Sequence, residues 1–319
     1  MRKYVPGLIL FILLAFCFFA ACTSIEKNKQ TEIIQWIPFN WIEVEISGRI
    51  FEKAAILIPV TIDGIPQKFI MQFDLGAIFS AFYEKPLKYF FEKHPFLNNI
   101  DTSISFQMNG HEFPALRNVN LRLGEVIFNN IDAGLLIDHG IEISPDSINS
   151  ETEILIGTIG ADLVKNKILI IDYKSNRLAI ADTLPPEYHN ASFQIMIVDN
   201  GRIKIPFLIN GKEENLMFDT GSSIFSLITT KENALEIGGN ETVDFLMVWS
   251  WFNYIPFYGL KTVSSVIFGD KKLENIIVYY NYDWDDFFKS ENIWGLTGNA
   301  LFFDNVVIID YKNNRFGVY

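Results

Sequence analysis

Two aspartates stand in matching settings, each at the end of an apolar run and each followed two residues later by glycine. They are Asp74, in Phe-Asp-Leu-Gly76, and Asp219, in Phe-Asp-Thr-Gly221-Ser222. Glycine lets the backbone turn sharply, and its N–H can point at the carboxylate. Two carboxylates within hydrogen-bonding distance cannot both ionise, so they share a proton. The ionised one can activate a water while the protonated one polarises a carbonyl, which is sufficient for amide hydrolysis without a metal.

An internal repeat places the two aspartates at equivalent points of the chain. The segment Ile58-Pro-Val-Thr-Ile-Asp-Gly64 is matched by Ile205-Pro-Phe-Leu-Ile-Asn-Gly211. Asp-Gly and Asn-Gly between alternating apolar residues are strong signals for a hairpin turn. In each copy the second strand of the hairpin ends at the Asp-x-Gly. Because duplicated lobes tend to pack about a pseudo-two-fold axis, we expect the two aspartates to meet there.

The ends of the two copies also match, and they define the domain boundaries. Residues 156–163 align with 294–301, and Ile-Asp-Tyr-Lys-Ser-Asn-Arg177 aligns with Ile-Asp-Tyr-Lys-Asn-Asn-Arg315. The sequence therefore predicts an N-terminal lobe over 45–183 and a C-terminal lobe over 190–319. Between them, 184–189 contains two consecutive prolines, which favour an extended linker. Asp172 and Asp310 lie in the matching closing segments, and we interpret them as turn residues.

The composition favours a mostly β fold. The chain of 319 residues contains 29 Phe and 12 Tyr together with long runs of Ile and Val, and aromatic and β-branched residues are enriched in strands. Helical patterns are few and short. They are 85–92 and 230–235, which follow the Asp-x-Gly pairs, and brief turns at 161–164 and 299–302.

The residues around Asp219 resemble the active-site signature of pepsin-like and retropepsin-like aspartic proteases. The run is Phe-Asp-Thr220-Gly-Ser-Ser223, and the closing segments of both copies resemble the end of such a lobe. The resemblance covers nearly all of both copies. It implies two acid-protease-type β-barrel lobes related by a pseudo-two-fold axis, with a substrate cleft between them. It also implies that Asp74 and Asp219 are catalytic, that no cofactor is needed, and that neighbouring residues support the pair, namely Gly76, Thr220, Gly221 and Ser222.

The first copy departs from this signature at two positions. Leu75 stands where the family has Thr or Ser, and Ala77 stands where the second copy has Ser222. In the family the threonine hydroxyls bond to the backbone of the opposite lobe, which Leu75 cannot do, so Thr220 is expected to lose a symmetric partner. Ser222 can donate to Asp219, whereas Ala77 offers Asp74 nothing. Since donors favour the charged form, we expect Asp219 to be ionised and Asp74 to be protonated.

Two segments are candidates for flaps over the cleft. Residues 104–113 read as a hairpin in the first lobe, and 245–254 occupy the same place in the second. The second segment is dense in aromatic residues. These could line a cleft for apolar side chains of a peptide, or they could pack between the lobes.

The first 22 residues form a secretory signal. Arg2 and Lys3 precede an apolar run that ends in small residues before Cys22, and this run is short for a membrane span. The arrangement resembles a bacterial lipoprotein signal, which implies lipidation of Cys22 and a place in the cell envelope, on the outer or cytoplasmic membrane and facing the periplasm or the exterior. An ordinary cleaved signal and a retained anchor are the alternatives. Residues 23–44 then read as a tether and lead-in.

Charge and the remaining polar residues exclude several classes. The net charge of −12 argues against nucleic acid. The four histidines (His94, His111, His139 and His189) have no ligand spacing, so we expect solvated surface residues and no metal site. The acidic run Asp283, Asp285 and Asp286 lacks the Gly and Glu of a calcium loop, and we interpret it as a solvated loop.

Two functions follow as hypotheses. In the first, the chain is an envelope-anchored aspartic endopeptidase that cuts peptides or a partner protein. In the second, it is a peptide-binding or scaffold module that keeps the fold without hydrolysis. The repeat predicts a monomer that imitates a dimer, and pairing of two chains through their Asp219 lobes is a further possibility.

Overall fold

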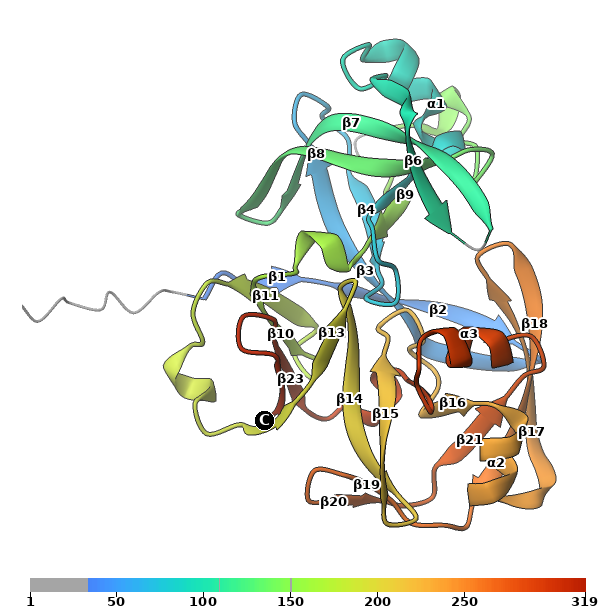
Figure 1. Cartoon of the computed structure of the whole chain (residues 1–319). Helices are drawn as coiled ribbons and strands as arrows, with labels where there is room; N and C mark the ends of the chain where they lie inside the picture. The colour runs from blue at the N-terminus through green and yellow to red at the C-terminus, as the bar shows by residue number, and fades with distance from the viewer. Residues whose placement is uncertain (1–33, 109, 150) are drawn as a thin grey trace, which may run out of the picture. The chain divides into compact units, whose positions relative to one another are not determined.

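The computed structural model describes residues 34–108, 110–149 and 151–319. Strands dominate and the helices are short (Figure 1), so the expected mostly β fold is confirmed. The described residues form one compact unit. Within it, two sheets follow the two copies of the repeat and a third sheet joins them.

The first-lobe sheet has the strand order β2-β3-β4-β9-β5-β8-β7-β6. Its strands are β2 (Asn40–Ile46), β3 (Arg49–Ile62), β4 (Phe69–Phe73), β5 (Ala81–Tyr83), β6 (Ile100–Met108), β7 (His111–Leu123), β8 (Val126–Leu136) and β9 (Ile154–Ile159). A further pairing of β3 with β7 closes the sheet on itself. Because β2 begins at Asn40, the lobe starts before the expected boundary at residue 45.

The second-lobe sheet repeats this order as β14-β15-β22-β16-β21-β18-β17, and β19 and β20 extend it beyond β14. Its strands are β13 (Ile197–Asp199), β14 (Arg202–Ile209), β15 (Lys212–Phe218), β16 (Leu227–Thr229), β17 (Gly238–Ser250), β18 (Asn253–Thr262), β19 (Val266–Phe268), β20 (Lys271–Leu273), β21 (Ile277–Tyr280) and β22 (Gly295–Thr297). The parallel pairs correspond as well: β4 with β9 matches β15 with β22, and β5 with β8 matches β16 with β21.

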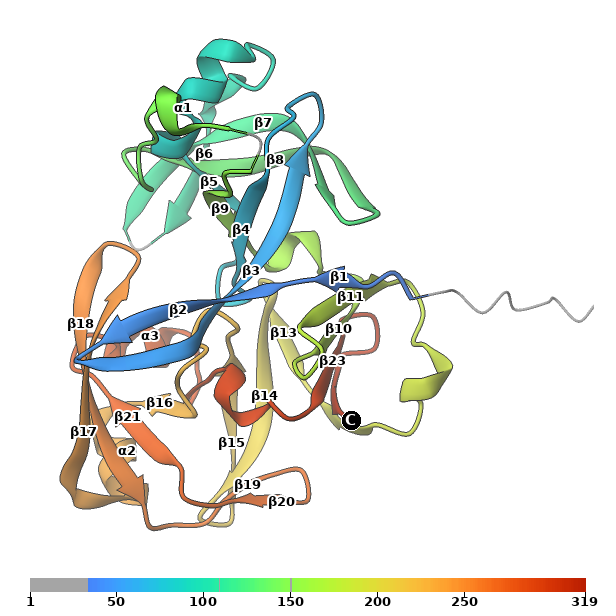
Figure 2. The ribbon, with the colours of Figure 1, turned by 180° about the vertical axis from the view of Figure 1, so that it is seen from behind.

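The interlobe sheet is symmetric about its two central strands. Its order is β1-β11-β10-β23-β24-β12, with β1 (Ile37–Pro38), β10 (Ile168–Asp172), β11 (Arg177–Ala181), β12 (Ser192–Ile195), β23 (Val306–Asp310) and β24 (Arg315–Val318). Antiparallel pairing of β10 with β23 joins the closing segments of the two copies (Figure 2). Asp172 and Asp310 end these strands and accept from the backbone N–H three residues on, as turn residues do.

Local sequence explains the hairpin turns and the helices. Gly64 and Gly211 have positive φ in the turns before β4 and β15, a conformation that glycine adopts without steric cost. The helices α1 (Glu84–Lys93) and α2 (Lys231–Ile237) confirm the two helical patterns. The 3-10 helices η2 (Ala161–Leu163) and η4 (Asn299–Leu301) lie at the expected brief turns, and η1 spans Pro145–Ser147.

Two segments differ from expectation. The linker 184–189 is not extended throughout, because Pro186–Tyr188 forms the 3-10 helix η3 and buries Tyr188 against the interlobe sheet. The acidic run is not a loop throughout, because α3 (Asp285–Ser290) begins within it. Burial of Phe288 in the second-lobe core gives that helix the apolar contact that a solvated loop lacks.

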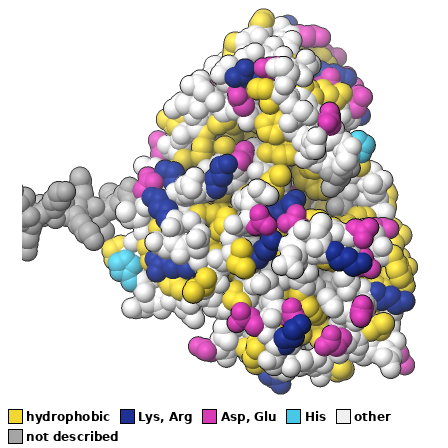
Figure 3. Space-filling view, in the orientation of Figure 1, with side chains coloured by type: hydrophobic (Ala, Val, Ile, Leu, Met, Phe, Trp, Pro, Cys, Tyr) yellow, Lys and Arg dark blue, Asp and Glu magenta, His cyan; other side chains and the backbone are white. Residues whose placement is uncertain are grey.

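Figure 3 shows acidic and basic side chains interspersed over one face of the molecule. Ion pairs between charged side chains include Lys68 with Glu151 and Arg117 with Asp101. Among the described residues no helix is long and apolar enough to cross a membrane. The signal sequence, Cys22 and the first half of the tether lie outside the described residues.

Candidate functional site

The two aspartates occupy equivalent strand ends. Asp74 follows β4 and Asp219 follows β15. Each backbone N–H donates to the neighbouring parallel strand, Asp74 to the Ile159 carbonyl and Asp219 to the Thr297 carbonyl, both at 3.0 Å. The same bond in both lobes fixes the direction in which each aspartate leaves its strand. Both side chains are buried.

The two carboxylates lie next to each other, because one backbone N–H reaches both. Gly76 N–H donates to Asp74 Oδ1 at 2.9 Å and to Asp219 Oδ1 at 3.0 Å. Neither Asp-x-Gly glycine has room for a side chain. A Cβ on Gly76 would lie 2.6 Å from Asp219 Cγ, and one on Gly221 would lie 2.6 Å from Asp74 Cγ. Each glycine therefore admits the carboxylate of the other lobe, which explains the residue type at both positions.

Thr220 ties the lobes together beneath the carboxylates. Its Oγ1 accepts from the Leu75 N–H at 2.9 Å and donates to the Phe73 carbonyl at 3.0 Å. Both partners are backbone groups, so Thr220 keeps its cross-lobe bonds although Leu75 has no hydroxyl. Leu75 itself is buried in the main core. The tie is one-sided and comes from the second lobe alone.

The donors to the two carboxylates are unequal. Asp219 accepts from Gly221 N–H at 2.8 Å and from Ser222 Oγ at 3.0 Å, as the sequence predicts. The expectation that Ala77 offers Asp74 nothing is wrong, because its backbone N–H donates to Asp74 Oδ1 at 3.2 Å. The first-lobe loop is also one residue shorter, since β5 begins seven residues after Asp74 and β16 begins eight after Asp219.

The surroundings of Asp74 change the pKa of its carboxyl. Burial, and then the negative charge of Asp219, raise the pKa of Asp74 well above its usual value. Beside it, Tyr83 bonds to Thr158 at 2.6 Å, and burial raises the pKa of Tyr83 to about 12. Tyr83 is therefore a neutral phenol at physiological pH and can only share or donate a proton.

Asn299 supports the second-lobe loop, a role that sequence reasoning missed. Its Nδ2 donates to the Thr220 carbonyl at 2.9 Å and to Ser223 Oγ at 2.7 Å, while its Oδ1 accepts from Tyr173 OH at 2.6 Å. The repeat puts Ala161 at the equivalent position in the first lobe. The mismatch of Asn299 with Ala161 is the signal that could have revealed this role.

A cavity of about 800 Å³ opens over the carboxylates, lined by residues of both lobes. Asp74, Asp219, Gly76, Gly221 and Ser222 line it. The second-lobe wall is rich in aromatic side chains, which are Trp249, Trp251, Phe252, Tyr254, Trp284 and Phe287. The expected aromatic lining of a cleft is therefore present.

Both expected flaps are hairpins, and the second-lobe one reaches the first lobe (Figure 1). The tip of β17–β18, at Trp251 and Phe252, packs in a first-lobe cluster around Tyr83 and Phe113. The ring of His139 lies 5.4 Å from that of Phe252. His139 is half-buried rather than a solvated surface residue, and burial lowers its pKa. The alternative reading of the aromatic segment, packing between lobes, therefore also holds at the tip.

Two further features accompany the contact of the β17–β18 tip with the first lobe, which are the backbone conformation of Trp251 and bonds between β17 and the β2–β3 turn. Trp251 has a φ of 54°, a left-handed conformation that is costly for a bulky residue and persists only where packing enforces it. Behind the hairpin, the turn between β2 and β3 meets β17. Arg49 pairs with Asp244 at 2.7 Å, and Ser47 Oγ accepts from the Met247 N–H at 3.1 Å.

Arg202 is a further residue of the site that sequence reasoning missed. It lines the cavity, and its Nε donates to the Gly76 carbonyl at 3.0 Å. Its guanidinium also pairs with Glu291. No motif marks it, since an arginine at the start of a strand is ordinary on its own.

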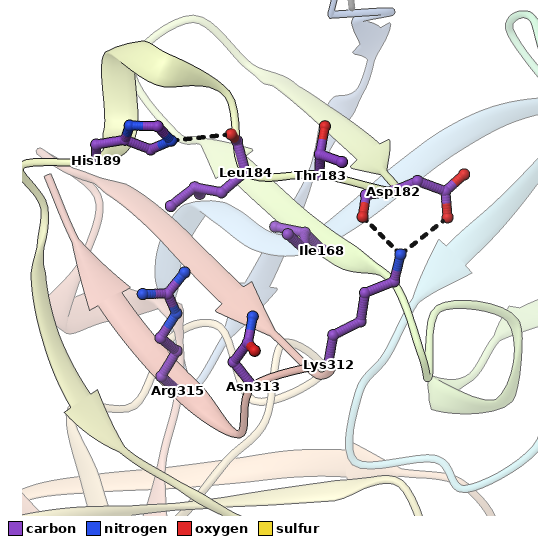
Figure 4. Close-up of a pocket in the computed structure, with 8 residues that line it drawn as sticks. All are labelled: Ile168, Asp182, Thr183, Leu184, His189, Lys312, Asn313 and Arg315. Atoms are coloured by element: carbon purple, nitrogen blue, oxygen red, sulfur yellow. Dashed lines mark hydrogen bonds and ion pairs between the residues drawn. The ribbon is translucent and has the colours of Figure 1, made fainter. Parts of the chain in front are cut away.

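Away from the carboxylates, a smaller cavity of about 400 Å³ lies between the interlobe sheet and the linker. Lys312 Nζ bonds to Asp182 there, and His189 Nε2 lies 3.3 Å from the Leu184 carbonyl (Figure 4). Two further lining residues, Asn313 and Arg315, bond to Asp310. Within the described part of the chain, no group of three or more His, Cys, Asp or Glu could hold a metal ion.

The geometry is that of two adjacent, buried carboxyl groups that line a cavity between the lobes. Such a pair can take a proton from water while giving one to a carbonyl oxygen. Comparison of the sequence with models of protein families and with curated proteins found no match.

Proposed function

We propose that this chain is an aspartic endopeptidase that hydrolyses peptide bonds with a water activated by Asp74 and Asp219. The observation that carries the proposal is the reciprocal approach of the lobes, in which each Asp-x-Gly glycine makes room for the opposite carboxylate. A pair of turn-capping aspartates has no need of this arrangement.

In the proposed reaction the ionised carboxylate removes a proton from water, and the resulting hydroxide adds to the peptide carbonyl carbon. The protonated carboxyl gives its proton to the carbonyl oxygen. The carboxyl that took the water proton then gives it to the amide nitrogen, and the other carboxylate takes a proton back from a hydroxyl of the tetrahedral intermediate. The C–N bond breaks, which yields a carboxylic acid and an amine and restores the starting protonation of the pair. Asp219 has more donors and Asp74 has a raised pKa, so we assign the resting proton to Asp74. The pair titrates as a unit.

The substrate of this proposal is an extended peptide or a protein segment with apolar side chains, because aromatic residues form much of the cavity wall. The signal and Cys22 extend the proposal to a bacterial cell envelope, with membrane attachment through lipid on the mature N-terminus. The duplicated lobes supply both carboxylates within one chain, so the proposed active form is a monomer.

A second candidate is a peptide-binding module without hydrolysis. The observation that favours it is the sequence of the first-lobe loop. Leu75 and Ala77 stand there at positions where the aspartic protease signature and the second lobe, respectively, have hydroxyl residues. In that case the cavity binds a peptide segment and releases it intact.

Separate Asp74→Asn and Asp219→Asn variants distinguish the two. The endopeptidase requires wild-type protein to cleave members of a broad peptide library between about pH 3 and pH 8, and requires each single variant to lose at least about 10³-fold in kcat/KM. Asp146→Asn, an exposed carboxylate in η1, is the matched control. Wild-type protein that binds peptides, cuts none and ignores statine-type inhibitors would establish the binding module.

A further inference from the structure

Arg202 connects the second lobe to the loop that carries Asp74. It is the first residue of β14, and its Nε donates to the Gly76 carbonyl at 3.0 Å. The remaining guanidinium pairs with Glu291 and lies over the Phe287 ring, 5.6 Å from its centroid. The side chain is 22% exposed. A permanent positive charge is thus held at the wall of the cavity by three contacts.

The first lobe has no equivalent of this arginine. Alignment of Ile58-Pro with Ile205-Pro puts Ala55 at the position of Arg202. The lobe that lacks the arginine is also the lobe in which Leu75 replaces a hydroxyl residue. Three second-lobe side chains bond to backbone groups at the first-lobe loop, namely Thr220, Arg202 and Asp219.

The bond from Arg202 acts on Asp74 through one peptide group. The carbonyl of the Gly76–Ala77 peptide accepts from Arg202, and the N–H of the same peptide donates to Asp74 Oδ1 at 3.2 Å. A charged donor on the carbonyl polarises the peptide and strengthens its N–H as a donor. The backbone bond to Asp74 favours the ionised carboxylate. Arg202 therefore stabilises the ionised form of Asp74 indirectly, through the Gly76–Ala77 peptide.

Other titratable groups line the same cavity as the carboxylate pair. They are Tyr83, His111, His139, Tyr254 and Asp283. Arg202 is the lining residue whose side chain is cationic at every pH of interest. Glu291 offsets this charge in part, and Lys204 Nζ donates to the Glu291 carbonyl at 2.6 Å.

We propose that Arg202 is a positioning residue that holds the Gly76–Ala77 peptide against Asp74, in place of the cross-lobe tie that Leu75 cannot make. It keeps the shared proton of the pair removable near the working pH. The effect on catalysis rests on the proposed function, whereas the effect on the titration of Asp74 does not.

The test is the titration of the Asp74 carboxyl carbon by NMR, assigned by its loss in Asp74→Asn. Arg202→Met removes the charge and keeps the length of the side chain, and it should raise the Asp74 midpoint by about half a pH unit or more. Glu291→Gln frees the guanidinium from its counter-ion, so it should lower the midpoint. Arg122→Met, at an exposed pair with Asp63 and outside the cavity lining, should leave it unchanged.

Kinetics give an independent readout. In Arg202→Met the acid limb of the pH profile should move upward with the midpoint, and kcat should fall more than KM changes. Arg202→Lys keeps the positive charge but lacks the planar guanidinium, and it should give an Asp74 midpoint between those of the wild type and Arg202→Met. This variant replaces Arg202→Met in the test if the methionine variant fails to fold. A protein that cleaves nothing but shows the opposed shifts contradicts the proposed function and supports the role of Arg202. If Arg202→Met and Arg202→Lys fold and the Asp74 midpoint does not change, the proposed role of Arg202 is wrong.

Discussion

At the scale of single residues, the two carboxylates share a position in the repeat but not the same surroundings. Asp219 has a serine donor and a loop supported by Asn299, whereas Asp74 relies on backbone N–H groups and on Arg202 behind them. Thr220 provides the cross-lobe bonds that a symmetric pair of threonines would share. The second lobe therefore organises the first-lobe loop that carries Asp74.

Replacement of Asp74 by asparagine should stabilise the protein at neutral pH. The folded chain holds the Asp74 proton more tightly than the unfolded chain, because the pKa of Asp74 is raised in the folded state. Stability from this group is complete below the unfolded pKa, about 4, and falls as the pH rises towards the folded value. Asp74→Asn removes that loss, so its Tm at pH 7 should exceed that of the wild type, by about 2–4 °C for each kcal/mol recovered.

The two melting temperatures should converge as the pH falls below about 4, where Asp74 is protonated in both the folded and the unfolded wild type. Asp146→Asn, exposed in η1, serves as the control and should leave the Tm unchanged at either pH. A lower Tm for Asp74→Asn at pH 7 would contradict the raised pKa.

At the scale of elements, the strands β10 and β23 end in the same Ile-Asp-Tyr but satisfy their tyrosines differently. Tyr173 OH donates to Asn299 Oδ1 at 2.6 Å. Tyr311 is buried, and within the described residues its hydroxyl has no hydrogen-bond partner. The cause is the residue opposite, because Ala161 occupies the place of Asn299 in the first lobe.

This difference predicts opposite outcomes for the same substitution. Tyr173→Phe leaves Asn299 Oδ1 without its buried donor and should cost about 1–3 kcal/mol of unfolding free energy. Tyr311→Phe removes an unsatisfied hydroxyl and should be neutral or stabilising by up to about 1 kcal/mol. Urea unfolding of the two variants measures both values. Equal losses would show that the hydroxyl of Tyr311 is satisfied in solution.

Elements with local signals could be predicted from the sequence. The turns at Gly64 and Gly211, the helices α1 and α2, and both hairpin flaps follow from residues close together in the chain. Features that depend on distant contacts could not. Helix α3 forms because Phe288 finds a core, and the tip at Trp251 finds its partners in the other lobe.

The same distinction applies to the candidate site. The repeat alone brought Asp74 and Asp219 together as a hypothesis, and the glycine positions explain why both can fit. The bonds of Ala77 and Arg202 to the first-lobe loop were not predictable, because both involve backbone groups and that of Arg202 also crosses between the lobes. The role of Asn299 left a signal, which is its mismatch with Ala161 in the repeat.

At the scale of the whole molecule, the lobes are not independent. The described residues form one compact unit, and β10 pairs with β23 through the middle of the interlobe sheet. Ile170 and Ile308 are fully buried there as paired residues. Separation of the lobes would expose both strands, which makes the interlobe sheet part of each lobe's stability.

We therefore expect one cooperative unfolding transition. Calorimetric and van't Hoff enthalpies should agree, and circular dichroism should coincide with tryptophan fluorescence. Ile308→Ala should cost about 2–5 kcal/mol and should preserve the single transition, because the loss is felt by both lobes. Two resolved transitions in the wild type, or a loss confined to one of two transitions in the variant, would show that the lobes unfold separately.

The contact of Trp251 and Phe252 with the first lobe has a topological consequence for the proposed reaction. The hairpin β17–β18 spans from the second lobe to the first above the cavity, and the carboxylate pair lies on the other side of the cavity. Together they surround it as a closed ring. The free end of a polypeptide can pass through such a ring, whereas the middle of a folded or cyclic chain can enter the cavity only when the hairpin moves away from the first lobe. Linear and cyclised versions of one peptide would then differ in their rate of capture, although they present the same bond to the same two carboxylates.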